Sequence, residues 1–181
     1  MGKERVIIFI DGSNYYHILK DLVDKSKKFI GFNFERFTEN IIGGRNLVRV
    51  YYYTSPLDRK KDELTYTKQQ QFFDKLRKIP KFELVLCRMQ RVVIHGQIIY
   101  QVKEDDIHLA VDMLKLAYND AYDTAILVSS DGDFVPAVKA VKETGRNVEN
   151  IGFENKFSYH LKQECDKFRK LNKVLMESFF D

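Results

Sequence analysis

The sequence has few of the residues that mark disordered, fibrous or disulfide-stabilised proteins. It contains 9 glycines, 3 prolines and 2 cysteines among 181 residues, which excludes collagen-like and low-complexity chains. Cys87 and Cys165 fit no zinc-ligand spacing, so we predict that both are reduced thiols in the core. The longest apolar run, Val6 to Ile10, is far shorter than the roughly 20 residues of a membrane helix. We therefore expect a cytoplasmic protein without a signal peptide or a membrane partner.

The composition is that of one globular domain. Hydrophobic residues make up 44% and charged residues 31% of the chain, which is enough to bury a single core. No internal repeat or low-complexity linker divides the sequence. We therefore predict one domain over residues 1–181.

Charge is distributed unevenly, although the net charge is only +4. Residues 59–91 contain ten lysines and arginines against four acids, and residues 104–133 contain eight acids against one lysine. An enzyme that binds a polyanion and gathers metal-binding carboxylates would need both regions. Solvated helix faces give similar totals, so the charge pattern leaves both interpretations open.

Strand-like and helix-like segments alternate along the chain, which predicts an α/β fold. Buried strands are expected at residues 6–10, 47–53, 82–87, 124–128 and 147–151. Residues 90–94 and 97–101 predict a hairpin that turns at His95 and Gly96. Helices are expected over residues 15–22, 62–78, 107–118 and 134–143, the first capped by Ser13 or Asn14. Residues 158–164 and 168–176 are expected to be helical or irregular.

The helix over residues 107–118 has an apolar stripe that we expect to face the sheet. The stripe consists of Ile107, Ala110, Val111, Leu114 and Tyr118. At about 100° per residue, this places Asp106 at the flank of the stripe and points Asp105 and Asp112 to the opposite side.

Two of the predicted strands end in acidic residues. Asp11 follows the first strand, and Asp131 and Asp133 follow the strand at residues 124–128. Ligands of open parallel sheets bind beyond the carboxyl ends of the strands, where Asp106 can join these acids. Carboxylates held together repel unless a cation neutralises them, and oxygen ligands favour Mg²⁺ or Mn²⁺. Either Asp-Gly pair alone is equally typical of a helix cap or a turn.

Three motifs stand in order along the chain. The first is Asp11-Gly12-Ser13-Asn14 after a hydrophobic strand, and the second is Lys103-Glu104-Asp105-Asp106 followed by Ala110-Val111-Asp112-Met113-Leu114. The third runs from Tyr122 to Pro136 and contains Ser129-Ser130-Asp131-Gly132-Asp133. Together they resemble the NYN domain of the LabA-like proteins, in the PIN-like nuclease superfamily. Two departures are Ser130, where the family usually has Gly, and Glu104-Asp105, where it more often has Gly and an apolar residue.

The resemblance implies a PIN-like three-layer α/β/α fold. Its central, mainly parallel sheet would have strand order 3-2-1-4-5, with the hairpin as an insertion. It also implies a Mg²⁺- or Mn²⁺-dependent ribonuclease, an endonuclease rather than an exonuclease, that hydrolyses RNA without a side-chain nucleophile. The implied metal ligands are Asp11, Asp106, Asp131 and Asp133, with Asp105 and Asp112 of second rank.

The remaining site residues are expected to bind substrate. Asn14 would orient Asp11 or contact the scissile phosphate. One ring of the Tyr15-Tyr16 pair is expected in the core and the other on a base, and we assign Tyr15 to substrate binding. The other expected contacts are the hydroxyls of Ser13 and Ser130 and the side chains of Arg59, Lys60 and Lys61.

Other functions remain open on the sequence. The same fold without hydrolysis would be a regulatory module that binds nucleic acid. A haloacid-dehalogenase-like phosphatase or a response-regulator receiver also uses strand-end aspartates, but the former needs a second Asp where Ser13 stands. The receiver needs a Lys where the chain has Gly152-Phe153. RNA is the expected partner, with DNA as the alternative, and the oligomeric state is open, a homodimer included.

Overall fold

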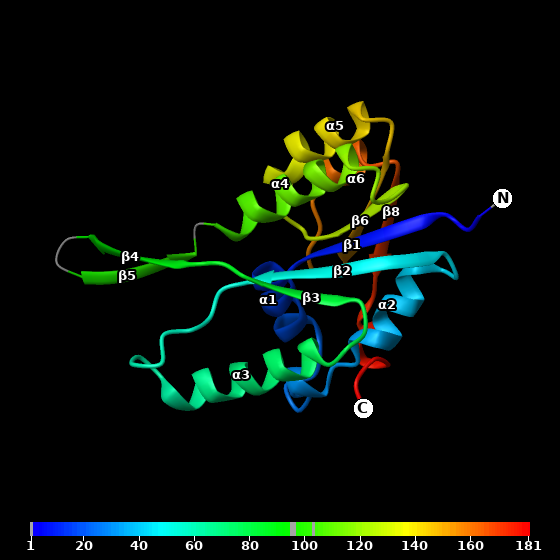
Figure 1. Cartoon of the computed structure of the whole chain (residues 1–181). Helices are drawn as coiled ribbons and strands as arrows, with labels where there is room; N and C mark the ends of the chain where they lie inside the picture. The colour runs from blue at the N-terminus through cyan, green and yellow to red at the C-terminus, as the bar shows by residue number, and fades with distance from the viewer. Residues whose placement is uncertain (1, 95–96, 103) are drawn as a thin grey trace.

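The computed structural model describes residues 2–94, 97–102 and 104–181, and its central element is a six-stranded sheet (Figure 1). Every pair of neighbouring strands in this sheet is parallel, in the order β3-β2-β1-β6-β7-β8. The strands are β1 (Arg5–Asp11), β2 (Asn46–Thr54), β3 (Phe82–Leu86), β6 (Thr124–Val128), β7 (Asn147–Phe153) and β8 (Lys167–Leu171). The first five have the predicted order 3-2-1-4-5, and the sheet is wholly rather than mainly parallel.

The sixth strand corrects the prediction for residues 168–176. β8 pairs with β7 from Glu149↔Lys167 to Phe153↔Leu171, and only the short helix α7 (Lys173–Glu177) follows it. Strands at the edge of a sheet carry charged side chains that discourage pairing with other chains. The basic residues of β8 are typical of such an edge strand, but in the sequence they resemble a surface helix or loop, so the strand was not predicted.

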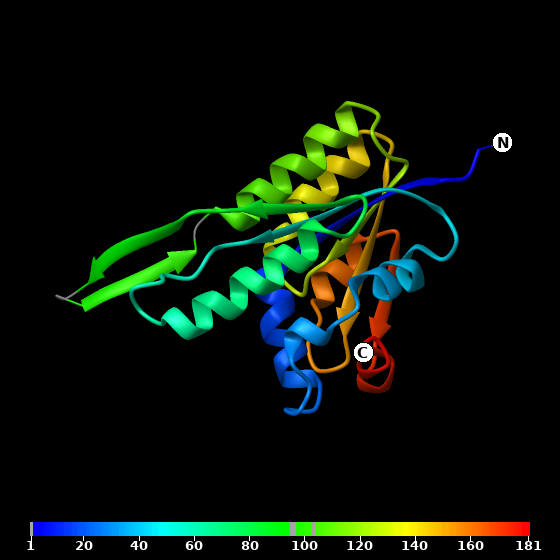
Figure 2. The same cartoon turned by 60° about the horizontal axis from the view of Figure 1, so that its bottom comes forward.

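Helices cover both faces of the sheet, which gives three layers (Figures 1 and 2). One face packs against α1 (Gly12–Leu22), α2 (Phe34–Ile42), α3 (Glu63–Arg77) and α7, and the other against α4 (Asp105–Tyr118), α5 (Val135–Glu143) and α6 (Tyr159–Glu164). Short 3-10 helices, η1 (Phe29–Gly31) and η2 (Gly132–Phe134), complete the helical elements. No element was predicted where η1 and α2 lie. None of the helices in the described part of the chain is long and apolar enough to span a bilayer.

The core follows from the wholly apolar β1. Alternate residues of a strand point to opposite faces, so Ile7 and Phe9 enter one apolar cluster while Val6, Ile8 and Ile10 enter the other. Each such side chain stabilises the fold by about 1.5–3 kcal/mol when fully buried. The two cysteines are free and buried, as predicted.

Helix α4 packs with the face opposite to the predicted one. Leu109, Met113 and Ala117 are buried against the sheet, whereas Ile107 and Tyr118 of the predicted stripe are 65% and 74% exposed. Both stripes recur every three or four residues, so periodicity alone does not choose between them. The inward face tolerates Asp105 and Asp112 because the hydroxyls of Ser13 and Tyr53, respectively, lie 3.1 Å from their carboxylates and donate to them.

A separate two-stranded sheet extends beyond the carboxyl ends of the main strands (Figure 2). It consists of β4 (Met89–Ile94) and β5 (Gln97–Val102), which pair antiparallel. The predicted turn at His95 and Gly96, and Lys103 of the second motif, lie outside the described residues.

Candidate metal centre

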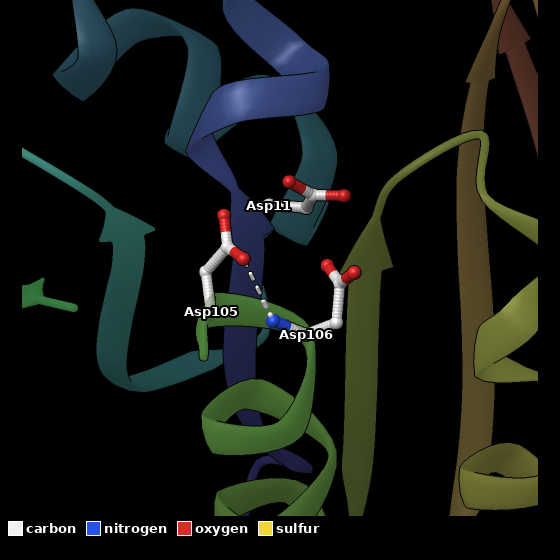
Figure 3. Close-up of side chains that lie close together, drawn as sticks. All are labelled: Asp11, Asp105 and Asp106. Carbon is white, nitrogen blue, oxygen red and sulfur yellow. Dashed lines mark hydrogen bonds between the residues drawn. The ribbon is translucent and has the colours of Figure 1, made fainter. Parts of the chain in front are cut away.

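The neighbouring strands β1 and β6 bring the acidic motifs to one edge of the sheet. They pair in parallel from Val6↔Thr124 to Ile10↔Val128. Asp11 and the turn that contains Asp131 therefore leave the sheet at the same edge, as expected if the strands are neighbours. Helix α4 begins at this edge, and Figure 3 shows its first two residues beside Asp11.

Asp11 is held by hydrogen bonds that also begin helix α1. Its carboxylate is buried, with 4% of the residue exposed. The Asn14 N–H donates to Oδ1 at 3.1 Å, and the Ser129 hydroxyl donates to Oδ2 at 2.9 Å. Asp11 itself is thus the N-cap, and the prediction of Ser13 or Asn14 as the cap was wrong by two or three residues. The helix starts earlier because the first strand runs directly into it.

Three carboxylates gather at this point: Asp11, Asp105 and Asp106 each offer an oxygen, and these oxygens lie within 4.8 Å of one another. Asp105 is buried, and the Ser13 hydroxyl donates to its Oδ2 at 3.1 Å. Asp106 is exposed, and its N–H donates to Asp105 Oδ1 at 3.2 Å (Figure 3). The group therefore opens to solvent through Asp106.

Burial and the charges of neighbouring acids make two of these carboxyl groups, those of Asp11 and Asp106, hard to ionise. Burial, reinforced by the charges of Asp106 and Asp105, raises the pKa of Asp11 to about 7 against the opposing hydrogen bonds from Asn14 and Ser129. Partial burial raises the pKa of Asp106 to about 6, with further contributions from the charges of Asp105, Asp131 and Asp133. A divalent cation would relieve this repulsion. The donors are all carboxylate oxygens, so the residues fit a hard metal ion.

Asp131 and Asp133 lie outside the group of three. Asp131 Oδ1 accepts from the Asp133 N–H at 2.9 Å and caps η2, and Asp133 is exposed. Their negative charges nevertheless act on Asp106. The two acids therefore belong to the rim of the centre, and their role as ligands stays a prediction.

The two second-rank aspartates differ from each other. Asp105 belongs to the cluster, while Asp112 accepts from the Tyr53 hydroxyl at 3.1 Å and from Lys115 Nζ at 2.8 Å. The expectation that Asp105 points away from the sheet was wrong, because it rested on the stripe that the structure exposes. The alternative stripe of Leu109 and Met113 would have placed Asp105 inward.

Polar residues join the two acidic turns. Asn14 Oδ1 accepts from the Ser130 N–H at 3.0 Å, and Ser129 Oγ accepts from the Asp131 N–H at 3.1 Å. Ser129 was not among the predicted site residues, although its position directly after a buried strand was a usable signal. The Ser130 hydroxyl donates to the Lys156 carbonyl at 2.8 Å, so it is engaged within the protein.

Tyr15 cannot stack on a base, which corrects its assignment to the substrate. It is 0% exposed, and its ring lies 5.8 Å from each of the rings of Phe32, Phe34 and Phe37, measured between centroids. The neighbouring Tyr16 is 40% exposed. Tyr15 is buried because it lies on the face of α1 that packs against the core.

The predicted basic residues lie in the exposed loop between β2 and α3, at the carboxyl end of β2 (Figure 1). Arg59 pairs with Glu63 across 2.6 Å, and Lys60 and Lys61 are exposed. They stay a prediction for substrate binding.

Comparison with known proteins finds one matching family model, a curated relative and a solved structure of similar fold. A family model described as "NYN domain" matches residues 5–172. The uncharacterized protein MJ0482 of Methanocaldococcus jannaschii is 39% identical over 66 residues, which cover 36% of this chain but only 28% of that protein. The crystal structure of VPA0982, a protein of unknown function from Vibrio parahaemolyticus RIMD 2210633, has a TM-score of 0.72. It is 22% identical, and the match covers 94% of each chain, so the likeness concerns the fold.

Proposed function

Because the chain belongs to the NYN domain family, of the PIN-like nucleases, we propose that it is a metal-dependent ribonuclease. The observation that carries the proposal is the group of three carboxylates at the carboxyl edge of the sheet. A buried acid with a raised pKa beside two further acids is typical of a catalytic centre, and Asp11 has this environment in addition to its role as the N-cap of α1.

Asp11, Asp105 and Asp106 would hold the ion, which we take to be Mg²⁺ or Mn²⁺. The bound ion would supply Lewis-acid polarisation of the scissile phosphodiester. Asp131 and Asp133 would add negative charge at the rim. Asp105, which the motif comparison ranked second, thus becomes a proposed ligand.

The protein's own hydrogen bonds fix the site before substrate arrives. Asn14 holds Asp11 through its N–H and the Ser130 N–H through its side-chain oxygen. Its Nδ2 group donates to none of the residues that the structure describes, and we propose that it donates to a phosphate oxygen. Ser13, whose hydroxyl donates to Asp105, would position that carboxylate rather than contact substrate.

RNA is the proposed substrate, cleaved internally. The exposed Arg59, Lys60 and Lys61 would attract its phosphates, and Tyr16 replaces Tyr15 as the ring of α1 that can meet a base.

The test is hydrolysis of a 5′-labelled single-stranded RNA of 20 nucleotides with Mn²⁺ or Mg²⁺. We expect internal cleavage that EDTA abolishes and that Asp11→Asn, Asp105→Asn and Asp106→Asn each suppress. Asp74→Asn is the matched control, because Asp74 is exposed and pairs with Arg77 on α3. A DNA of the same sequence measures the preference between the two nucleic acids. RNA binding without cleavage in either metal would overturn the ribonuclease and favour a regulatory module.

A further inference from the structure

The loop between β7 and α6 lies against the acidic turn after β6. The Ser130 hydroxyl donates to the Lys156 carbonyl at 2.8 Å. A side-chain carbon built at Gly132 would lie 3.2 Å from Ser158 Oγ and 3.9 Å from His160 Cδ2. The loop and the first turn of α6 therefore adjoin the segment that carries Asp131 and Asp133.

Helix α1 holds the other side of this loop. Asn155 Nδ2 donates to the Ile18 carbonyl at 3.2 Å, and Ile18 follows Asn14 by one helical turn. The loop is thus attached to both elements that supply the polar residues of the centre. A nucleotide chain that lies along the loop would therefore lead directly to a phosphodiester held at the carboxylates.

Three lysines of this loop, of α6 and of β8 are exposed and, among the residues that the structure describes, unpaired, although Glu154 and Glu164 lie in the same segments. Lys156, Lys162 and Lys170 are exposed, and none of them forms an ion pair within residues 2–94, 97–102 and 104–181. By contrast, Arg59 of the β2–α3 loop is already paired with Glu63 at 2.6 Å. Unpaired cations beside an acidic centre complement a chain of phosphates in which one phosphate sits at the centre.

Exposed aromatic rings stand among these cations. Tyr159 is 61% exposed and Phe157 39% exposed. Lys170 Nζ lies 5.4 Å from the centre of the Phe157 ring, and Lys162 Nζ lies 5.7 Å from that of Phe168. Alternating cations and accessible rings are typical of surfaces that bind unpaired nucleotides, where phosphates meet the cations and bases stack on the rings.

We propose that this surface, the Lys156 patch, binds the unpaired RNA nucleotides that adjoin the scissile phosphate. The patch consists of Lys156, Phe157, Tyr159, His160, Lys162 and Lys170. Tyr159 stacks on a base and Lys156 neutralises a phosphate. The inference rests on the proposed ribonuclease function and assigns residues that the three family motifs do not contain.

The experiment measures binding without hydrolysis. Fluorescence anisotropy with a labelled 12-nucleotide uridine RNA, in EDTA, is recorded for wild type, Tyr159→Ala, Tyr159→Phe and Lys156→Ala. Tyr118→Ala and Lys3→Ala are matched controls: Tyr118 is 74% exposed on α4, and Lys3 is exposed at the opposite end of the sheet. All of these side chains are exposed, and equal thermal unfolding midpoints check the folding of each variant.

Tyr159→Ala should weaken binding by between five-fold and a hundred-fold, the range of one stacked base, and Tyr159→Phe should retain it. Lys156→Ala should weaken binding a few-fold and reduce the slope of log affinity against log salt by about 0.7. Both controls should stay within two-fold of wild type. Wild-type affinity in Tyr159→Ala and Lys156→Ala would overturn the inference, as would equal weakening by the controls.

The two proposals fail in different ways. If RNA is cleaved but neither Tyr159→Ala nor Lys156→Ala changes affinity or KM, the Lys156 patch is refuted and the ribonuclease stands. If both variants lose binding while wild type cleaves nothing with Mn²⁺ or Mg²⁺, the patch stands and the ribonuclease is refuted.

Discussion

Asp11-Gly12 and Asp131-Gly132 each follow a buried strand and each begin a helical turn, yet the protein packs them differently. Asp11 is buried, with 4% exposed, while Asp131 is half-buried and caps a short 3-10 helix. Gly12 is enclosed, since an added side-chain carbon would lie 2.5 Å from the Tyr53 carbonyl. At Gly132 the nearest atom is a serine hydroxyl at 3.2 Å. Burial, and not the Asp-Gly pair itself, thus distinguishes the two carboxylates.

The largest expected difference between the two turns is in metal binding. Asp11→Asn should weaken Mn²⁺ affinity by at least about 10²-fold, because it removes a buried charge, and Asp131→Asn by only about 10-fold. Isothermal titration calorimetry measures both, with Asp74→Asn as the control. Equal losses at the two positions would mean that both aspartates contact the ion equally, whatever their burial.

The second largest difference is expected in stability when a methyl group is added at each glycine. Gly12→Ala should lower the free energy of unfolding by about 3 kcal/mol, because the new carbon meets the Tyr52 ring and the Tyr53 carbonyl. Gly132→Ala should cost less than about 1 kcal/mol, since the Ser158 hydroxyl can give way. Urea denaturation in EDTA tests the pair. Similar costs for both would show that the first turn is not tighter than the second.

The pH dependence of stability depends on Asp11 and, to a smaller extent, on Asp106, whose pKa is raised less. The pKa of Asp11, about 7 in the fold, lies above the ordinary value of 3.8. Between these values the unfolded chain has released the proton while the folded chain keeps it, so stability falls as pH rises through this range. Asp11 should account for about 2–3 kcal/mol of that fall between pH 5 and 8 in EDTA.

Asp11→Asn should remove this part of the pH dependence, and Asp131→Asn should leave it in place. The measurement compares the free energy of unfolding at pH 5 and pH 8 for the three proteins. Saturating Mn²⁺ should restore the stability of wild type at pH 8. Identical pH profiles for wild type and Asp11→Asn would show that burial does not hold the proton.

The smallest effect is expected at the rim. Asp133→Asn should weaken Mn²⁺ affinity only about three-fold, because Asp133 is exposed and water screens its charge. Added salt should reduce the effect further, whereas the loss in Asp11→Asn should persist. A salt-independent loss at Asp133 would identify it as a ligand.

Local sequence patterns predicted the parts of the fold that depend on neighbouring residues. The apolar run of β1 was predicted correctly from its residues, as was the meeting of Asp11 with Asp106, and the order of the first five strands was predicted correctly from the family resemblance. The position of β8 was missed, since its basic residues resemble a surface helix or loop. The prediction of which face of α4 packs against the sheet was wrong, because apolar residues occupy both sides of that helix.

The sequence by itself determined which acids stand at strand ends, because a strand-ending Asp-Gly pair is a local property of the chain. Only the tertiary structure decided which of them are buried together. Asp105 turns inward because the Ser13 hydroxyl, 92 residues away, donates to it, and Tyr15 enters the core because the phenylalanine rings of residues 29–37 surround it. Such contacts join distant segments, and no spacing along the chain encodes the desolvation that they impose on a carboxylate.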